Sequence, residues 1–125
     1  MELVRRVYEA VGRDWDAVMA AYSPDTEWDD RDMRPEGAVR RGARAMQEHM
    51  RTWFGTWRNY HWQIERMVDA GEEVVVIGRE RGEGKGSGIT LDQPVGLIVT
   101  VRDGLIVRTR VFKDPSAALR AAGLS

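Results

Sequence analysis

The sequence predicts one α+β domain in which a cone-shaped, curved antiparallel (mixed) sheet wraps on three N-terminal helices and a short C-terminal helix follows. Two observations predict it. Apolar residues recur at helical spacing in the first half of the chain, whereas from Tyr60 onward they alternate with polar residues, as in strands. The later strands are separated by turn sequences such as Arg102-Asp103-Gly104. The length suits a single core, and no repeat or linker interrupts residues 1–125, so we expect one domain.

Three helices are expected before the main sheet. The first should end at Gly12, and Asp14 should cap the second, because its carboxylate can accept hydrogen bonds from the free amides of the next turn. Pro24 is expected to close that second helix, whose buried stripe would hold Trp15, Val18, Met19 and Tyr22. A third helix is expected over 43–57, with one face formed by Met46, His49, Met50, Trp53 and Trp57.

The strand pattern begins with a short segment over 26–29, followed by a long polar loop over 30–41. Residues 74–77 are typical of a central strand, and the glycine-rich stretch 82–88 of a sharply bent hairpin at the rim of the sheet. Two final strands are expected over 97–101 and 105–112. In the last one, Val107, Thr109 and Val111 should share a face opposite Arg108 and Arg110.

Composition excludes several classes of function. The formal net charge of −1 offers no global attraction to nucleic acid or to an anionic membrane, so neither is an expected partner. The absence of cysteine excludes disulfides and thiolate chemistry. No stretch approaches the ~18 continuous apolar residues of a membrane span, and the first residues do not form a signal peptide, so we expect a cytoplasmic protein.

The order of these motifs resembles the SnoaL-like and ketosteroid-isomerase-like families of the nuclear-transport-factor-2-like superfamily. The resemblance is carried by Asp14-Trp15-Asp16, the stretch from Ala21 to Asp30, Gly42, the stretch from Arg102 to Val107, and the stretch from Asp114 to Leu124. It implies a cystatin-like cone with a pocket between the third helix and the concave sheet face, and a homodimer through the outer sheet face. It also implies a small hydrophobic ligand and no cofactor, but no single activity, because the fold hosts many functions.

Asp30 is the candidate general base, since it matches the aspartate that ketosteroid-isomerase-like members use. The oxyanion donors of those isomerases are not matched. The family's first-helix tyrosine falls near Arg6, Tyr8 is expected on the wrong helix face, and the family's sheet aspartate falls near Leu97. Ketosteroid isomerisation is therefore not expected. The ordinary alternative for Asp30 is a solvated carboxylate or an ion pair with Arg31, Arg40 or Arg41.

His49 lies on the stripe of the third helix that would face the cavity, where an imidazole can act as acid, base or hydrogen-bond donor. The alternative, which we favour at this point, is a half-buried histidine bonded to a backbone carbonyl. His61 should lie on the other side of its strand, and the two histidines do not suggest a metal site. Arg79, Glu80 and Arg81 are expected to be solvated or paired across strands, unless one arginine faces the cavity.

Rings and thioethers in the sequence suggest an apolar cavity for a flat ligand, although each could equally be plain core. The expected ligand-binding residues are Tyr22, Trp28, Met46, Met50, Trp53, Trp62 and Thr109. Three functions remain open: a cofactor-free isomerase, cyclase, dehydratase or hydrolase; a non-catalytic binding protein; and a dimeric interaction module. A cavity with both Asp30 and His49 pointing inward would favour the enzyme.

Overall fold

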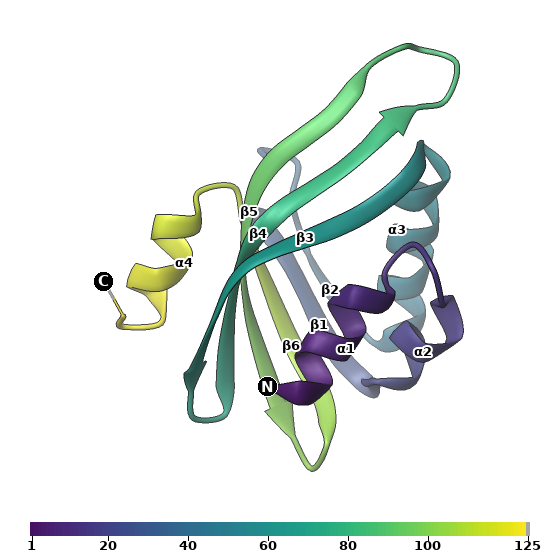
Figure 1. Ribbon diagram of the computed structural model, residues 1–125. Coiled ribbons are helices and arrows are strands. Elements are labelled where there is room, and N and C mark those ends of the chain that lie inside the picture. Colours follow the sequence, from purple (N-terminus) through teal and green to yellow (C-terminus); the bar gives the residue numbers. More distant parts are fainter. Residues whose placement is uncertain (125) are drawn as a thin grey trace.

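The computed structural model describes residues 1–124 and has four helices and six strands (Figure 1). The elements are, in chain order, α1 (Glu2–Ala10), α2 (Trp15–Ala20), β1 (Tyr22–Asp32), β2 (Val39–Arg41), α3 (Ala43–Gly55), β3 (Trp57–Ala70), β4 (Glu73–Gly84), β5 (Thr90–Arg102), β6 (Leu105–Phe112) and α4 (Pro115–Ala121). None of the helices in this described part is long and apolar enough to cross a bilayer.

The six strands form one strongly curved sheet in the order β2-β1-β6-β5-β4-β3. All neighbours are antiparallel except β1 and β6, which are parallel, so the sheet is mixed. Helix α3 contacts β1 and β2 at one edge of the sheet and β3 at the other. The sheet therefore curls around α3, and the predicted α+β cone is confirmed.

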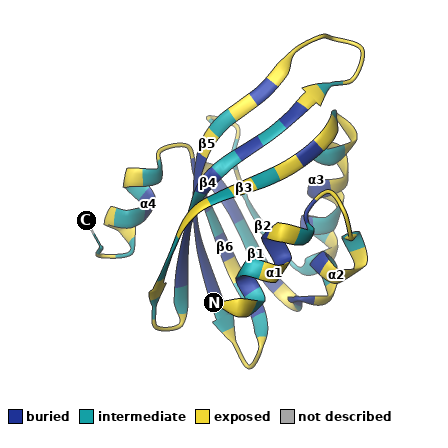
Figure 2. Cartoon of the chain, viewed as in Figure 1, coloured by how far each residue is buried: buried dark blue, intermediate teal, exposed yellow. Residues whose placement is uncertain are grey.

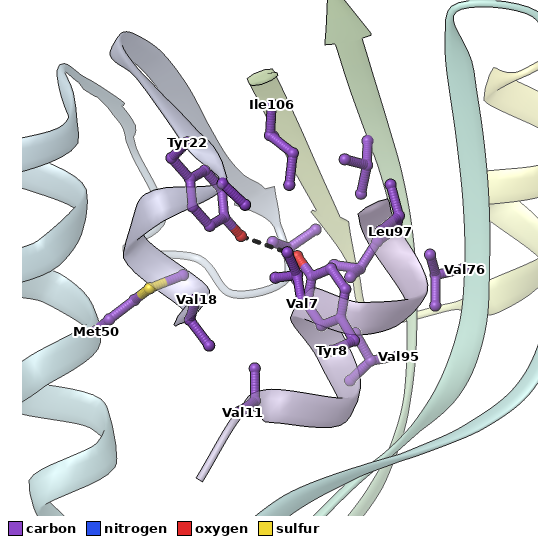
Figure 3. Close-up of a cluster of buried hydrophobic side chains, with 14 of the residues drawn as sticks. Val7, Tyr8, Val11, Val18, Tyr22, Met50, Val76, Val95, Leu97 and Ile106 are labelled. Atoms are coloured by element: carbon purple, nitrogen blue, oxygen red, sulfur yellow. Dashed lines mark hydrogen bonds between the residues drawn. The ribbon is translucent and has the colours of Figure 1, made fainter. Parts of the chain in front are cut away.

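Buried residues alternate with more exposed ones along the strands (Figure 2), and they form two hydrophobic clusters, one on each face of the sheet. The larger core joins α1, α2 and α3 to the concave face, where Val76, Leu97, Val99 and Ile106 are fully or almost fully buried (Figure 3). A smaller core lies on the outer face, where α4 covers residues such as Val75, Ile98 and Phe112. Asp114 caps α4 by accepting a hydrogen bond from the amide of Ser116, as its position before a proline predicts.

Two expectations about the first strand are wrong. Pro24 does not close a helix, because α2 already ends at Ala20 and Pro24 lies inside β1, where the pairing with β6 is interrupted between Tyr22 and Glu27. Tyr22 is therefore a strand residue. Residues 30–41 are not one long loop either: β1 continues to Asp32, a short loop over 33–38 follows, and β2 pairs back onto β1.

Two smaller corrections concern the element that contains Trp57 and the residues of β6 that face the core. Trp57 starts β3 instead of ending the third helix. In β6 an irregularity opposite Thr100 and Val101 shifts the alternation, so that Ile106, and not Val107, joins Thr109 and Val111 in burial on the concave side. The hairpin at 102–105, the glycine-rich hairpin between β4 and β5 and the Asp14 cap of α2 are all confirmed.

Gly12 joins α1 to α2 at a point where the backbone touches β3. Its φ of +84° favours glycine, and a Cβ placed there would lie 1.9 Å from the carbonyl oxygen of Tyr60. A side chain at position 12 would therefore push the first two helices away from the strand that carries Tyr60 and Trp62.

Gly12→Ala should lower the free energy of unfolding by about 2–4 kcal/mol, because it combines backbone strain with a backbone clash. Urea unfolding measures the change. Gly55→Ala is the matched control: no atom lies within 4 Å of its Cβ position. Because position 55 lies in a helix, Gly55→Ala should raise the free energy of unfolding by about 0.4–1 kcal/mol. Equal effects of the two variants would show that the Gly12 contact is not a constraint.

Candidate functional site

A cavity of about 50 Å³ lies between α3 and the concave face of the sheet. That volume holds a few water molecules, so a larger ligand requires side chains at its border to move. Its wall is mainly apolar and includes six aromatic side chains, which together are called the aromatic wall: Tyr8, Trp28, Trp53, Phe54, Tyr60 and Trp62. Four polar or charged side chains also border it: Asp30, Arg34, His49 and Glu80.

Asp30 is buried, with a side chain only 2% exposed, and its oxygens are well supplied with donors. Arg40 of β2 approaches both carboxylate oxygens at 2.9 Å, and the backbone amide of Ala38 donates to Oδ1 at 2.8 Å. The expected alternative of an ion pair between Asp30 and Arg40 is therefore present in the structure. Unlike a solvated loop residue, Asp30 also borders the cavity.

The loop over 33–38 makes this arrangement possible through Gly37. A Cβ on Gly37 would lie 2.2 Å from the carbonyl oxygen of Asp30, so only glycine lets the loop lie this close to β1. The close approach brings the Ala38 amide to the carboxylate and places Met33 and Arg34 beside the cavity. Arg34 lies over the ring of Trp53, with 4.9 Å between its Cζ and the ring centroid.

His49 faces the same carboxylate from α3. Its Nε2 lies 3.4 Å from Oδ2 of Asp30, and its ring packs near Trp28. Burial, followed by the positive charge of Arg40, lowers the pKa of His49 below its usual 6.5, and the negative charge of Asp30 opposes this shift. His49 is therefore neutral near pH 7. The favoured alternative, a bond to a backbone carbonyl, is absent among the described contacts of His49.

Four of the seven expected ligand-binding residues border the cavity: Trp28, Met50, Trp53 and Trp62. The other three are buried without bordering it. Met46 and Thr109 are completely buried in the core, and Tyr22 directs its hydroxyl to the hydroxyl of Tyr8 at 3.4 Å (Figure 3). Met46 shares the stripe of α3 but lies about one turn nearer the start of that helix, where it is part of the larger core.

The sequence patterns did not place Tyr8 or Glu80 at the cavity, although both border it. Tyr8 was expected on the wrong helix face, yet it borders the cavity and packs against Trp62, with 5.2 Å between ring centroids and the ring planes tilted by 56°. Glu80 was expected to be solvated or paired across strands, and it is paired across strands, because Tyr60 of β3 and Gln93 of β5 donate to its oxygens. It is also only 5% exposed and borders the cavity, whereas Arg79 and Arg81 pair with Asp92 of β5 on the other side. The alternation of β4 separates Glu80 from the two arginines.

Metal ligation is not suggested by the geometry. Within residues 1–124, no three histidine, aspartate or glutamate side chains converge as a metal site would require. His61 is exposed on β3, donates a hydrogen bond from Nδ1 to the backbone oxygen of Asn59, and does not border the cavity.

Comparison with known proteins places the chain in a family. The family model described as the SnoaL-like domain matches residues 4–109, so the chain belongs to the SnoaL-like family. No curated protein matches the sequence.

Solved structures agree on the fold. A nuclear-transport-factor-2-like protein from Burkholderia thailandensis is 27% identical, with a TM-score of 0.78 over 96% of this chain and 94% of that one. A protein from Catenulispora acidiphila with a ketosteroid-isomerase-like fold, in complex with trimethylamine, is 21% identical, with a TM-score of 0.77 over 99% and 94%. A putative SnoaL-like polyketide cyclase from Jannaschia sp. is also 21% identical, with a TM-score of 0.78 over 99% and 91%.

The lowered pKa of His49 should make the protein less stable in mild acid. Between pH 6.5 and the lower folded-state pKa, the unfolded chain binds a proton that the folded chain does not, so stability falls as pH falls through this window. Urea unfolding between pH 8 and pH 5 should therefore show a smaller loss for His49→Gln than for the unchanged protein. His61→Gln serves as the control and should keep the full loss. An equal loss in the His49 variant would contradict the predicted shift.

Proposed function

We propose that the chain is a cofactor-free SnoaL-like enzyme that moves a proton on a small, largely apolar molecule, with His49 as the proton carrier and Asp30 as its positioning residue. The reaction classes that fit are isomerisation, cyclisation, dehydration and hydrolysis. The observation that carries the proposal is that Asp30 and His49 lie 3.4 Å apart at the border of one mainly apolar cavity. Both groups at a single cavity favour an enzyme over a passive carrier.

His49 suits the carrier role better than Asp30. Both oxygens of Asp30 already interact with the guanidinium of Arg40, and one of them also accepts the Ala38 amide. A carboxylate engaged in this way is a poor acceptor for a substrate proton, but it can orient an imidazole beside it. A neutral imidazole can accept a proton near pH 7, and the imidazolium that forms would lie beside the negative charge of Asp30.

The size and lining of the cavity support a small ligand with limited polarity. The cavity holds a few waters in its closed form, and the aromatic wall offers ring faces for stacking or for contact with methyl groups. A structural neighbour is in complex with trimethylamine, a molecule of this size, although at 21% identity that likeness concerns the fold.

Two other functions remain as alternatives. A non-catalytic binding protein would use the same cavity and differ only in leaving its ligand unchanged. A dimer through the outer sheet face is also proposed, and it would have to form beside α4, which covers Val75, Ile98 and Phe112 on that face.

Native mass spectrometry of protein purified from its own host should reveal a bound small molecule, and the same spectra report whether the chain is a dimer. Identified ligands would then be incubated with the protein in D₂O, and NMR would follow the incorporation of deuterium or the appearance of product. His49→Gln should lower this rate by about 100-fold or more, the usual contribution of a general base. His61→Gln, the control, should stay within about twofold.

The pH dependence of the rate distinguishes the role of His49 from that of Asp30. The rate of the unchanged protein should fall with pH through the lowered pKa of His49. Asp30→Asn should lower the rate and also move this fall to still lower pH, because the Asp30 charge is what raises the pKa of His49. A full rate in His49→Gln would remove His49 from the mechanism. A ligand that is bound but never exchanges or reacts would favour the non-catalytic binding protein over the enzyme.

A further inference from the structure

Glu80 is a buried carboxylate in which both oxygens act as acceptors. The hydroxyl of Tyr60 donates to Oε2, and the side-chain amide of Gln93 donates to Oε1. Trp62 completes the network, since its indole N–H donates to the Tyr60 oxygen at 3.1 Å. A carboxyl group that only accepts hydrogen bonds is in the arrangement expected of its ionised form.

Tyr60 keeps its proton in this network. Burial, followed by the charge of Glu80, raises the pKa of Tyr60 well above its usual 10. The phenol is therefore a donor at every ordinary pH. It satisfies the carboxylate without supplying positive charge, and so does the amide of Gln93.

No positive charge of the described residues 1–124 neutralises Glu80. Its two neighbours in sequence, Arg79 and Arg81, pair with Asp92 on the other face of the sheet. Asp30, the second carboxylate at the cavity, differs in having Arg40 in contact with both of its oxygens. A buried charge is stable when it is paired, and the cavity that Glu80 borders is the remaining source of a partner.

The surroundings of Glu80 suit a cation. Tyr60 and Trp62 form the part of the aromatic wall nearest to this carboxylate in the hydrogen-bond network, and ring faces attract positive charge. The guanidinium of Arg34 also borders the cavity, over Trp53, so a bound cation would have to lie away from it, on the side of Tyr60 and Trp62. His49, which is neutral near pH 7, adds no repulsion.

We propose that Glu80 is the counter-charge for a small organic ammonium ion that binds in the cavity against Tyr60 and Trp62. This inference rests on the proposed function, because it names the chemical class of the molecule on which His49 would act. The ammonium group would lie at Glu80, and the reacting part of the molecule would extend towards His49 and Asp30.

Three probes of nearly equal shape test the charge preference: tetramethylammonium, tert-butanol and trimethylacetate. They carry a positive charge, no charge and a negative charge. A ¹H–¹⁵N NMR titration would follow the indole N–H of Trp62, assigned with Trp62→Phe, because that proton is part of the Glu80 network. Tetramethylammonium should bind at least about tenfold more tightly than either of the other two probes. Equal or tighter binding of tert-butanol or trimethylacetate, or no binding of tetramethylammonium, would overturn the proposal.

Substitutions test whether the preference for a positively charged probe comes from Glu80. In Glu80→Gln the affinity for tetramethylammonium should fall about tenfold or more, while that for tert-butanol changes little. Tyr60→Phe is the matched control, because it removes a donor to Glu80 but keeps the negative charge, and it should still prefer the cation. A preference that persists in folded Glu80→Gln would refute the assignment. If Glu80→Gln does not fold, Glu80→Asp tests the assignment instead. This variant keeps the negative charge and should keep the preference for tetramethylammonium, and loss of that preference would count against the proposal.

The binding test is independent of proton transfer. His49→Gln should keep the preference for tetramethylammonium over tert-butanol, because that preference is assigned to the charge of Glu80 and not to His49. Loss of the charge preference together with normal deuterium exchange would reject only the ammonium site. A retained preference with no exchange would reject only the role of His49.

Discussion

Helix α3 is held between the two edges of a single sheet, and the other features of the molecule depend on this closure. It contacts β1 and β2 on one side and β3 on the other, so the sheet must curl to reach both. A curled sheet cannot follow a straight helix closely along its whole length. The space left between them is the cavity, and it collects side chains from α1, α3, β1 and β3 that are far apart in the sequence.

The two buried carboxylates at this cavity are stabilised in different ways. Asp30 is neutralised by an arginine from the adjacent hairpin, a pairing that also ties β2 and the loop over 33–38 to β1. Glu80 has only uncharged donors, from β3 and β5. The cavity is therefore bordered by one carboxylate whose charge is balanced by an arginine beside an imidazole, and by another that has only uncharged donors. This asymmetry would orient a ligand that carries a charge of its own.

Local patterns in the sequence predicted the elements well, because capping, turns and periodicity act over a few residues. The Asp14 cap, the stripe of α3 and the hairpins around 103 and 86 are of this kind. Glu80 could not be found in this way. It follows the continuous apolar run of β4, which hides which positions face inward, and its partners Tyr60 and Gln93 come from other strands. Tyr8 was misassigned because the rotation of α1 about its axis is set by packing on the sheet, and Thr109 because burial alone does not place a residue at the cavity.

The loop over 33–38 has a consequence for kinetics. Met33 and Arg34 border the cavity from this loop, and Arg34 covers the ring of Trp53. A molecule too large for the closed volume enters only after these side chains have moved aside, so the frequency of that motion would limit its association rate. The same cover would lengthen the residence time, because the loop must open again before the molecule can leave.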